Sequence, residues 1–310
     1  MRIASLLPSA TEIVCAVGGR EELVGRSHEC DYPPGIEAVP VLTSARIGPV
    51  VASKAIDEAI REVLKEALAV YEIDMEGLRQ AAPDVIVTQD LCDVCAVSRD
   101  DVHAALARLA QKNVMVANLH PTRLEDVWLD IQRVADAIDR SAAGRDVVRD
   151  LALRVDRVAA RARGAARRPA VLSIEWIDPV MIGGMWMPEL IALAGGEPLV
   201  TVPGQHAPTL ATPQLAALDP EVIVIKPCGF DRERTLAELS TLRQTLPWSA
   251  WGPRRRVYVA DGNAYFNRPG PRIVESLEIL AACVHPESFG DFAAKHRESF
   301  VRLTPDLRPD

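Results

Sequence analysis

The side chains with the most distinctive chemistry in this sequence are six cysteines: Cys15, Cys30, Cys92, Cys95, Cys228 and Cys283. Thiolates are the soft donors that zinc, cobalt or an iron–sulfur unit selects. Cys92 and Cys95 are separated by two residues, a spacing that lets both sulfurs face one ion. Cys30 and Cys228 could close the set from other parts of the chain. These four cysteines are therefore the candidate metal ligands.

Other uses of the cysteines stay open at this point. His28 or His206 could replace one thiolate of the set, and a single Cys-x-x-Cys pair also fits plain packing or redox chemistry. Cys15 and Cys283 lie inside apolar helical patterns, so we expect both in the core. Six cysteines in 310 residues are too few for a disulfide scaffold.

A second group of polar and aromatic residues follows the short apolar runs of the sequence. Flat rings could cover a macrocycle or a chelate, and Arg268 could pair with a carboxylate or phosphate of a ligand. Trp186 fits a ligand contact and an interface between lobes equally well. The candidate ligand-binding residues are Ser9, His28, Glu29, Tyr32, Glu175, Trp176, His206, Phe230, Tyr265, Phe266 and Arg268.

Short apolar runs that alternate with helical stretches must position these residues. Runs such as 3–7, 85–88 and 170–174 read as buried strands, and stretches such as 53–71 and 99–112 read as helices. This alternation predicts an α/β fold with parallel sheets covered by helices. Ligands of such sheets bind beyond the carboxyl ends of the strands, which is where the candidate residues stand.

One segment departs from the alternation. From Thr122 onward, apolar residues recur at spacings of three and four, which predicts about 40 residues of helix, with Gly144 as a possible interruption. We expect this helix to act as a rigid strut between lobes. The predicted organisation is an amino-terminal α/β lobe at 1–119, a linker helix at 120–166 and a carboxyl-terminal α/β lobe at 167–310.

The two halves of the chain resemble each other. A strand, a helix closed by Gly-Gly and a Leu-Val pair occur at residues 3–24 and again at 171–200. The phrase Ala-Pro-Asp-Val-Ile-Val at 82–87 is nearly repeated as Asp-Pro-Glu-Val-Ile-Val at 219–224. The internal similarity predicts two lobes of one design.

Composition excludes several classes of protein. The chain has 48% apolar and 25% charged residues, as ordinary globular proteins do. Its net charge is −8 and no basic face is evident, so we expect no nucleic-acid partner. No run approaches the ~20 apolar residues of a spanning helix, and no leader is evident. We therefore expect a cytoplasmic protein, or a periplasmic one if a leader was removed.

The sequence resembles the substrate-binding proteins of ABC transporters for cobalamin and ferric siderophores. The resemblance rests on the segments 5–12, 82–87 and 219–224 and on the linker helix. It implies two Rossmann-like lobes bridged by one long α-helix, a ligand cleft between the lobes and a transporter permease as partner. Because no export signal is evident, the chain looks like a cytosolic branch of that family.

Two hypotheses for the function follow. The first is binding of cobalamin, another corrinoid or a metal chelate. The alternative is a cytosolic metalloenzyme or iron–sulfur protein that uses Cys30, Cys92, Cys95 and Cys228, with Glu29, Asp93 or Glu175 as proton carrier. No nucleophile elbow, phosphate-binding loop or dinucleotide motif is present, so no catalytic residue is assigned and binding leads.

Overall fold

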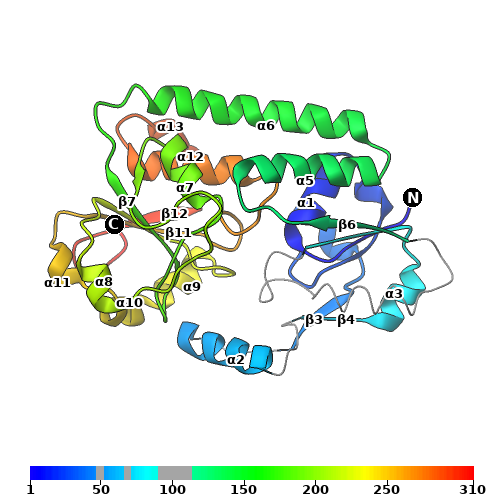
Figure 1. Ribbon diagram of the computed structural model, residues 1–310, viewed down its shortest axis with the longest axis horizontal. Helices are drawn as coiled ribbons and strands as arrows, with labels where there is room; N and C mark the ends of the chain where they lie inside the picture. The colour runs from blue at the N-terminus through cyan, green and yellow to red at the C-terminus, as the bar shows by residue number, and fades with distance from the viewer. Residues whose placement is uncertain (47–51, 66–70, 90–113) are drawn as a thin grey trace. The chain divides into compact units, whose positions relative to one another are not determined.

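The computed structural model describes residues 1–46, 52–65, 71–89 and 114–310 (Figure 1). The chain divides into two compact units. Unit 1 comprises Met1–Val51, Ala55–Pro121 and Glu125–Asp150, and unit 2 comprises Ala52–Lys54, Thr122–Leu124 and Leu151–Asp310. Each unit has a largely parallel sheet with helices packed on it, which confirms the predicted α/β fold of two lobes.

Unit 1 is built on a sheet of short apolar strands. Its order is β2-β1-β5-β6 and every neighbouring pair is parallel. The strands are β1 (Ile3–Ser5), β2 (Leu23–Arg26), β5 (Val85–Gln89) and β6 (Met115–Leu119). β1 and β5 are buried along their whole length, which explains why they read as continuous apolar runs.

Helices and a small two-stranded sheet complete unit 1. The strands β3 (Thr43–Ala45) and β4 (Tyr71–Ile73) pair antiparallel. Tyr71 therefore belongs to a strand, and the predicted helix 53–71 is wrong at its end. The predicted helix 99–112 lies outside the described residues. The helical segments are α1 (Pro8–Ala16), the 3-10 turns η1 (Arg20–Glu22) and η2 (Ile36–Ala38), α2 (Ser53–Lys65) and α3 (Met75–Ala81).

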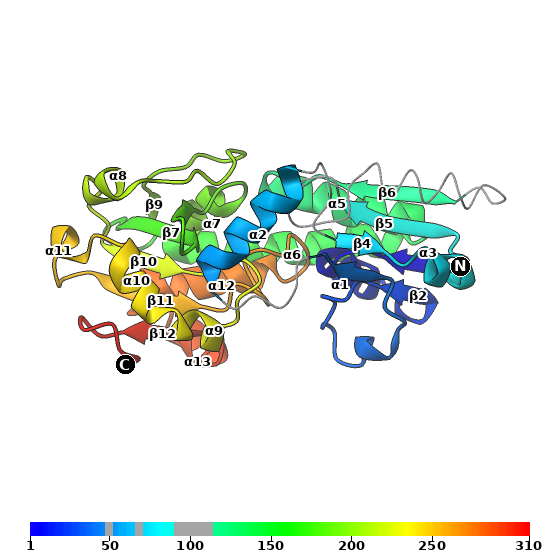
Figure 2. The ribbon, with the colours of Figure 1, turned by 90° about the horizontal axis from the view of Figure 1, so that it is seen from below.

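Unit 2 has a larger mixed sheet in the order β12-β11-β10-β7-β8, with β9 also paired to β7 (Figure 2). The neighbours β7, β10 and β11 are parallel, whereas β12 and β8 run antiparallel to β11 and β7. The strands are β7 (Ala170–Trp176), β8 (Met181–Ile182), β9 (Glu197–Pro198), β10 (Val222–Ile225), β11 (Arg256–Ala260) and β12 (Phe300–Leu303).

The helices of unit 2 pack on this sheet. The helix α12 is buried at nearly every position, as expected of a helix that is mostly apolar. Leu172, Ile223 and Val257 of the three parallel strands meet in one apolar cluster. The helices are α7 (Met187–Leu193), α8 (Thr212–Ala216), α9 (Arg232–Ala237), α10 (Leu239–Thr245), α11 (Trp248–Trp251), α12 (Ile273–Val284) and α13 (Gly290–Lys295).

The predicted internal similarity is confirmed by the topology. In unit 1, β1 leads through α1 to its parallel neighbour β2, and β5 pairs on the other side of β1. In unit 2, β7 leads through α7 to its parallel neighbour β9, and β10 pairs on the other side of β7. The repeated phrases at 82–87 and 219–224 therefore enter equivalent strands.

The predicted single helix of the linker is two helices, α5 (Leu124–Ala137) and α6 (Ser141–Ala162). Asp139 adopts a left-handed conformation with φ of 58°. The N–H of Arg140 donates to the carbonyl of Ala135 at 2.7 Å, and that of Asp139 donates to Asp136 at 3.2 Å. These two bonds form the Schellman arrangement that ends a helix.

Gly144 does not interrupt the linker as expected. It lies in the first turn of α6, where an added Cβ would stand 2.5 Å from the Cβ of Ala135 on α5. The missing side chain therefore lets the two helices approach closely. The helix α6 continues without a break from the part in unit 1, up to Asp150, into the part in unit 2, from Leu151.

Candidate functional site

In unit 1, the carboxyl ends of β1 and β2 carry a short chain of hydroxyl and thiol groups. The hydroxyl of Thr11 donates to Ser5 Oγ at 2.7 Å and lies 3.1 Å from the sulfur of Cys30. All three side chains are buried. Cys30 is therefore held inside the unit by α1, an arrangement that the sequence pattern did not reveal.

His28 lies beside these hydrogen-bonded groups and is positioned by residues of two elements. Its Nδ1 lies 2.7 Å from the hydroxyl of Thr43, which donates its own proton to Ser27 at 3.1 Å. Because Thr43 has no second proton to give, it accepts from the Nδ1–H of His28, and the lone pair of the neutral ring is on Nε2. Burial lowers the pKa of His28, and the nearby Arg26 lowers it further against the opposing effect of Glu29. A neutral imidazole is the form that binds a metal.

The remaining predicted residues of unit 1 differ in access. Tyr32 is 40% exposed, and Glu29 is exposed with its carboxylate accepting from the hydroxyl of Tyr71 at 2.6 Å. The ring of Tyr71 contacts His28 edge-on, with centroids 4.9 Å apart. Ser9 is 2% exposed inside the first turn of α1, and its role as a ligand contact stays a prediction.

His120 is a residue that the sequence reasoning missed. It follows β6 directly and is exposed at the carboxyl end of the sheet. Its backbone N–H donates to Asp130 Oδ2 at 3.1 Å, and burial raises the pKa of Asp130 to about 6 despite the opposing charge of Arg133. The rule that ligands bind beyond the carboxyl ends of strands also applies to the apolar run 114–117, so it could have identified His120.

In unit 2, three loops are joined at the carboxyl ends of β7, β10 and β11. Lys226 is fully buried, and its Nζ donates to Glu175 Oε2 at 2.9 Å and to Asn267 Oδ1 at 3.3 Å. Asn267 in turn donates to the carbonyl of Gly262 at 2.8 Å. A buried ammonium group with both partners in place fixes the loops relative to one another.

Trp176 ends β7 next to this buried pair. Its ring contacts Phe230 edge-on with centroids 5.2 Å apart, and the guanidinium of Arg234 lies 3.8 Å from the centroid of Phe230. Phe230 is 1% exposed and supports the ring of Trp176, and its role as a ligand contact stays a prediction. The indole Nε1 of Trp176 is buried and has no hydrogen-bond partner in the described part of the chain.

The loop after β11 contains three predicted residues with different environments. Phe266 is 1% exposed, and its carbonyl accepts from the indole of the buried Trp186 at 2.8 Å. Arg268 is buried and donates to Asn263 Oδ1 at 3.0 Å. Phe266, Arg268 and Trp186 thus make contacts inside unit 2, and the roles of Phe266 and Arg268 as ligand contacts stay predictions. Tyr265 is half-buried.

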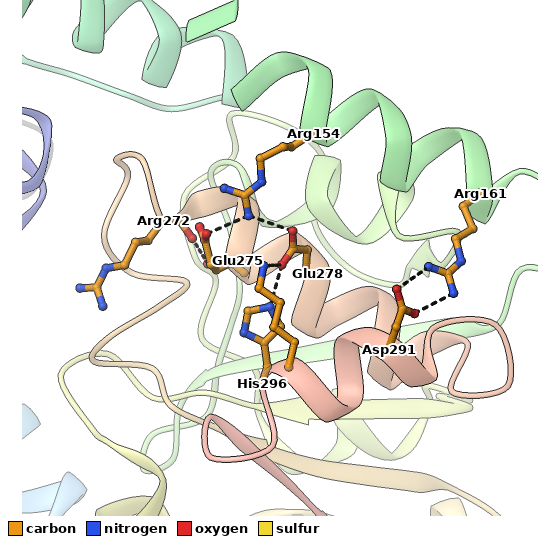
Figure 3. Close-up of polar contacts among 9 residues, drawn as sticks. Arg154, Arg161, Arg272, Glu275, Glu278, Asp291 and His296 are labelled. Atoms are coloured by element: carbon orange, nitrogen blue, oxygen red, sulfur yellow. Dashed lines mark hydrogen bonds and ion pairs between the residues drawn. The ribbon is translucent and has the colours of Figure 1, made fainter. Parts of the chain in front are cut away.

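A network of ion pairs joins α6, α12 and α13 (Figure 3). The ring of Tyr265 faces that of His296 at 6.3 Å, and His296 Nε2 lies 2.7 Å from Glu278 Oε2. Arg154 of α6 donates to Glu278 and to Glu275, at 2.8 Å each. The loop is therefore connected to the linker helix through charged groups.

The charge on Glu278 is strongly stabilised. Burial alone raises the pKa of this carboxyl, but hydrogen bonds from His296, Lys295 and Arg154 outweigh burial and lower it to about 2. Its side chain is 6% exposed, so these contacts are shielded from water. A second pair, Arg161 with Asp291 at 2.7 Å, joins α6 to α13 (Figure 3).

The predicted metal set is only partly described. Cys92 and Cys95 lie outside the described residues, Cys30 is in unit 1 and Cys228 is in unit 2. Cys228 is half-buried, and its N–H donates to the carbonyl of Glu175 at 3.1 Å. No group of three or more His, Cys, Asp or Glu side chains could hold a metal among the described residues. The four-thiolate site stays a prediction.

Three other sequence predictions concern single residues. His206 is exposed on the segment between β9 and α8. Cys283 is fully buried in α12, as expected, whereas Cys15 in α1 is only half-buried.

Within the described ranges, no helix is both long enough and apolar enough to cross a membrane.

Comparison with known proteins gives consistent matches over nearly the whole chain. The family described as "Periplasmic binding protein" matches residues 3–249. A vitamin B12-binding protein of Photorhabdus laumondii is 22% identical over 283 residues, covering 90% of this chain and 86% of that protein.

Two solved structures share the fold. A periplasmic heme-binding protein from Pseudomonas aeruginosa has a TM-score of 0.67 and 20% identity, covering 92% of each chain. The vitamin B12-binding protein BtuF of Vibrio cholerae has a TM-score of 0.63 and 18% identity, covering 92% of this chain and 96% of that one.

Proposed function

Because the chain belongs to the periplasmic binding protein family, we propose that it binds cobalamin or a related corrinoid. The ligand would be bound by loops at the carboxyl ends of the parallel strands, where ligands of α/β sheets bind. The vitamin B12-binding relatives support a corrinoid, and the heme-binding relative supports the wider class of flat metal chelates.

The observation that carries this proposal is the environment of Trp176. The ring is half-buried and supported edge-on by Phe230, while its N–H lacks a partner among the described residues. A buried donor without a partner is costly, and a ligand carbonyl would remove that cost once a small shift of the indole brings its N–H to the surface. Corrinoids offer both a flat ring edge and amide carbonyls around it.

The anchoring of Trp176 favours binding by a preformed surface. The neighbouring Glu175 is held by the buried Lys226, which is itself bound to Asn267. Loops that are already ordered lose less conformational entropy when a ligand binds, so more of the interaction energy becomes affinity.

The charges favour a corrinoid over heme. Heme carries two carboxylates, which call for cations, whereas the side groups of a corrinoid are mostly neutral amides. Lys226 and Arg268 are already bound to Glu175 and Asn263. In unit 1, the side chains near His28 include the hydroxyls of Ser27 and Thr43, which suit amides, and the charges of Arg26 and Glu29 there oppose each other.

His28 supplies a spectroscopic reporter for the proposal. Its Nε2 has a free lone pair in the tautomer that Thr43 selects, so it can replace water on the cobalt of aquocobalamin. We expect such a replacement to shift the visible spectrum of the corrinoid, and we expect His28→Ala to abolish that shift.

The test is titration with aquocobalamin and, separately, with heme. We expect one equivalent of corrinoid to bind and the unfolding midpoint to rise, since ligand at 100 times Kd adds about 2.7 kcal/mol to stability. Trp176→Phe keeps an aromatic ring but removes the N–H, and should weaken binding about 5-fold to 10-fold. Trp248→Phe, whose N–H donates to Leu242 away from these loops, is the matched control.

Two outcomes would contradict the proposal. One is the absence of any spectral or thermal response to the corrinoid. The other is equal loss of affinity in Trp176→Phe and Trp248→Phe. Tighter binding of heme than of corrinoid would keep the binding function and replace its ligand. Measurement of zinc, cobalt and iron in anaerobically purified protein tests the alternative with Cys30, Cys92, Cys95 and Cys228.

A further inference from the structure

A cavity lies in unit 2, at the opposite edge of its sheet from Trp176. Pro169 precedes β7, Glu221 precedes β10 and Arg256 opens β11. The register pairs Val222 with Val171 on one side and with Arg256 on the other. The amino ends of β7, β10 and β11 are therefore neighbours. Residues from all three line a cavity of about 550 Å³.

The cavity is rich in positive charge. Four arginines line it, against the two carboxylates of Glu221 and Glu287. The whole chain has a net charge of −8, so the local excess of cations is opposite to the charge of the protein. Such a local reversal attracts anions to one place on an otherwise acidic surface. The four are Arg167, Arg254, Arg255 and Arg256.

Three of these arginines are fixed by contacts within the unit. Arg256 donates to the carbonyl of Val284 at 3.1 Å, at the carboxyl end of α12. Arg255 donates to the carbonyl of Trp251 at 2.7 Å and pairs with Asp219. Arg167 pairs with Glu221. The wall of the cavity is therefore ordered before any ligand arrives.

The fourth arginine has no such contact. Arg254 is exposed and makes no hydrogen bond or ion pair with any other described residue. Its guanidinium keeps all of its donors available next to the ordered wall. An unpaired guanidinium can bind two oxygens of one phosphate at once, a geometry that a water molecule does not match.

We propose that this cavity is a binding site for a small phosphate-bearing anion, with Arg254 as its principal contact. The volume lies in the range of small-molecule sites, and it would hold a ligand the size of a nucleotide. Because the cavity is at the amino ends of the strands, it is separate from the loops that contain Trp176. The proposal does not depend on corrinoid binding.

The experiment is calorimetric titration of the full chain with inorganic phosphate, pyrophosphate and ATP at low and at high salt. We expect saturable binding of at least one probe that weakens as salt rises. Comparison of the three probes distinguishes a free phosphate from a nucleotide. Arg254→Glu should weaken binding at least 10-fold, because it replaces attraction by repulsion at an exposed position where folding is unaffected.

Arg297→Glu is the matched control. It makes the same change of charge in unit 2, at a side chain that is 79% exposed and does not line the cavity. Equal weakening in both variants would show a general charge effect and overturn the proposal, as would no binding of any probe below about 10 mM. Titration of Arg254→Glu with aquocobalamin should be unchanged, so failure of this site and failure of corrinoid binding can be told apart.

Discussion

The carboxyl ends of the strands are fastened by different interactions in the two units. In unit 1, neutral groups such as Ser5, Thr11 and Cys30 meet in a short chain of hydrogen bonds. In unit 2, the buried ammonium of Lys226 meets the carboxylate of Glu175. The two sheets share the order of their first strands, so the difference comes from the side chains on equivalent loops.

This difference indicates how each edge would respond to mutation. A neutral hydrogen bond contributes about 1 kcal/mol, and its loss leaves little uncompensated charge. A buried charge that loses its partner costs several kcal/mol, even where the intact pair adds little. We therefore expect mutations at the carboxyl ends of the strands to lower stability more in unit 2 than in unit 1. Four predictions test that contrast, from the largest effect to the smallest.

Glu175→Ala should have the largest effect. It leaves the ammonium of Lys226 buried with only Asn267 as partner, and should lower the free energy of unfolding by about 3–5 kcal/mol. Denaturant unfolding measures the change. The double variant Glu175→Ala with Lys226→Met removes the buried charge as well and should recover most of the loss. A single-variant effect below about 1 kcal/mol would contradict the contrast.

Acid should act strongly on unit 2 through Glu278. The pKa of this carboxyl is about 2 in the folded chain, below the value of 4.5 of an unperturbed glutamate. The carboxylate therefore contributes stability that is present above pH 4.5 and is lost as the pH falls toward 2, on the order of 3 kcal/mol in all. Unfolding free energies measured from pH 6 to pH 2 should show this slope.

Glu278→Gln is the check on the assignment of that slope. The amide cannot ionise, so the variant should lose stability at pH 6 and change less with acid than the parent chain does. An unchanged slope would assign the acid response to other carboxyl groups.

Asp130 in unit 1 should respond with the opposite sign. Burial raises its pKa from 3.8 to about 6, so the folded chain binds the proton more tightly than the unfolded chain does. Stability from this group is therefore present below pH 3.8 and lost as the pH rises through 6, by about 2 kcal/mol after allowance for the exposed Arg133. Asp130→Asn should remove this part of the pH dependence. If the variant keeps it, the assignment of this pH dependence to Asp130 is wrong.

Thr11→Val should have the smallest effect of the four. It preserves the shape of the side chain but removes the hydroxyl that links Ser5 and Cys30, and should cost about 1 kcal/mol. Denaturant unfolding with Thr235→Val, whose hydroxyl donates to Asp231 in unit 2, gives a matched comparison. A loss as large as that of Glu175→Ala would mean that the two edges do not differ.

Much of the fold could be predicted because its strands are short apolar runs with clear ends. The strand at 300–303 could not, since its antiparallel pairing with β11 depends on a partner some 40 residues away in the chain. The division of the linker was also hidden. Apolar spacing continues through Ile138, and the left-handed residue that ends α5 is Asp139, where glycine is the usual signal.

The candidate site was predictable as a set of loops but not as a set of contacts. Position after a strand correctly marked Trp176 and Tyr265 as members of the loop cluster. It could not separate a ring that stays half-exposed from one that is fully buried, as Phe230 and Phe266 are. Nor could it show that Lys226 is buried, because the partner that makes burial tolerable, Glu175, comes from another strand.

The helix α6 has a consequence for how the whole chain melts. Its residues up to Asp150 depend on unit 1 for support and those from Leu151 depend on unit 2. The two parts of this helix, residues 141–150 and 151–162, are each too short to be stable without tertiary packing, so loss of either unit would fray the part that the other unit supports. We therefore expect a single calorimetric transition, and damage on one side of residue 150 should lower the midpoint recorded by probes on the other.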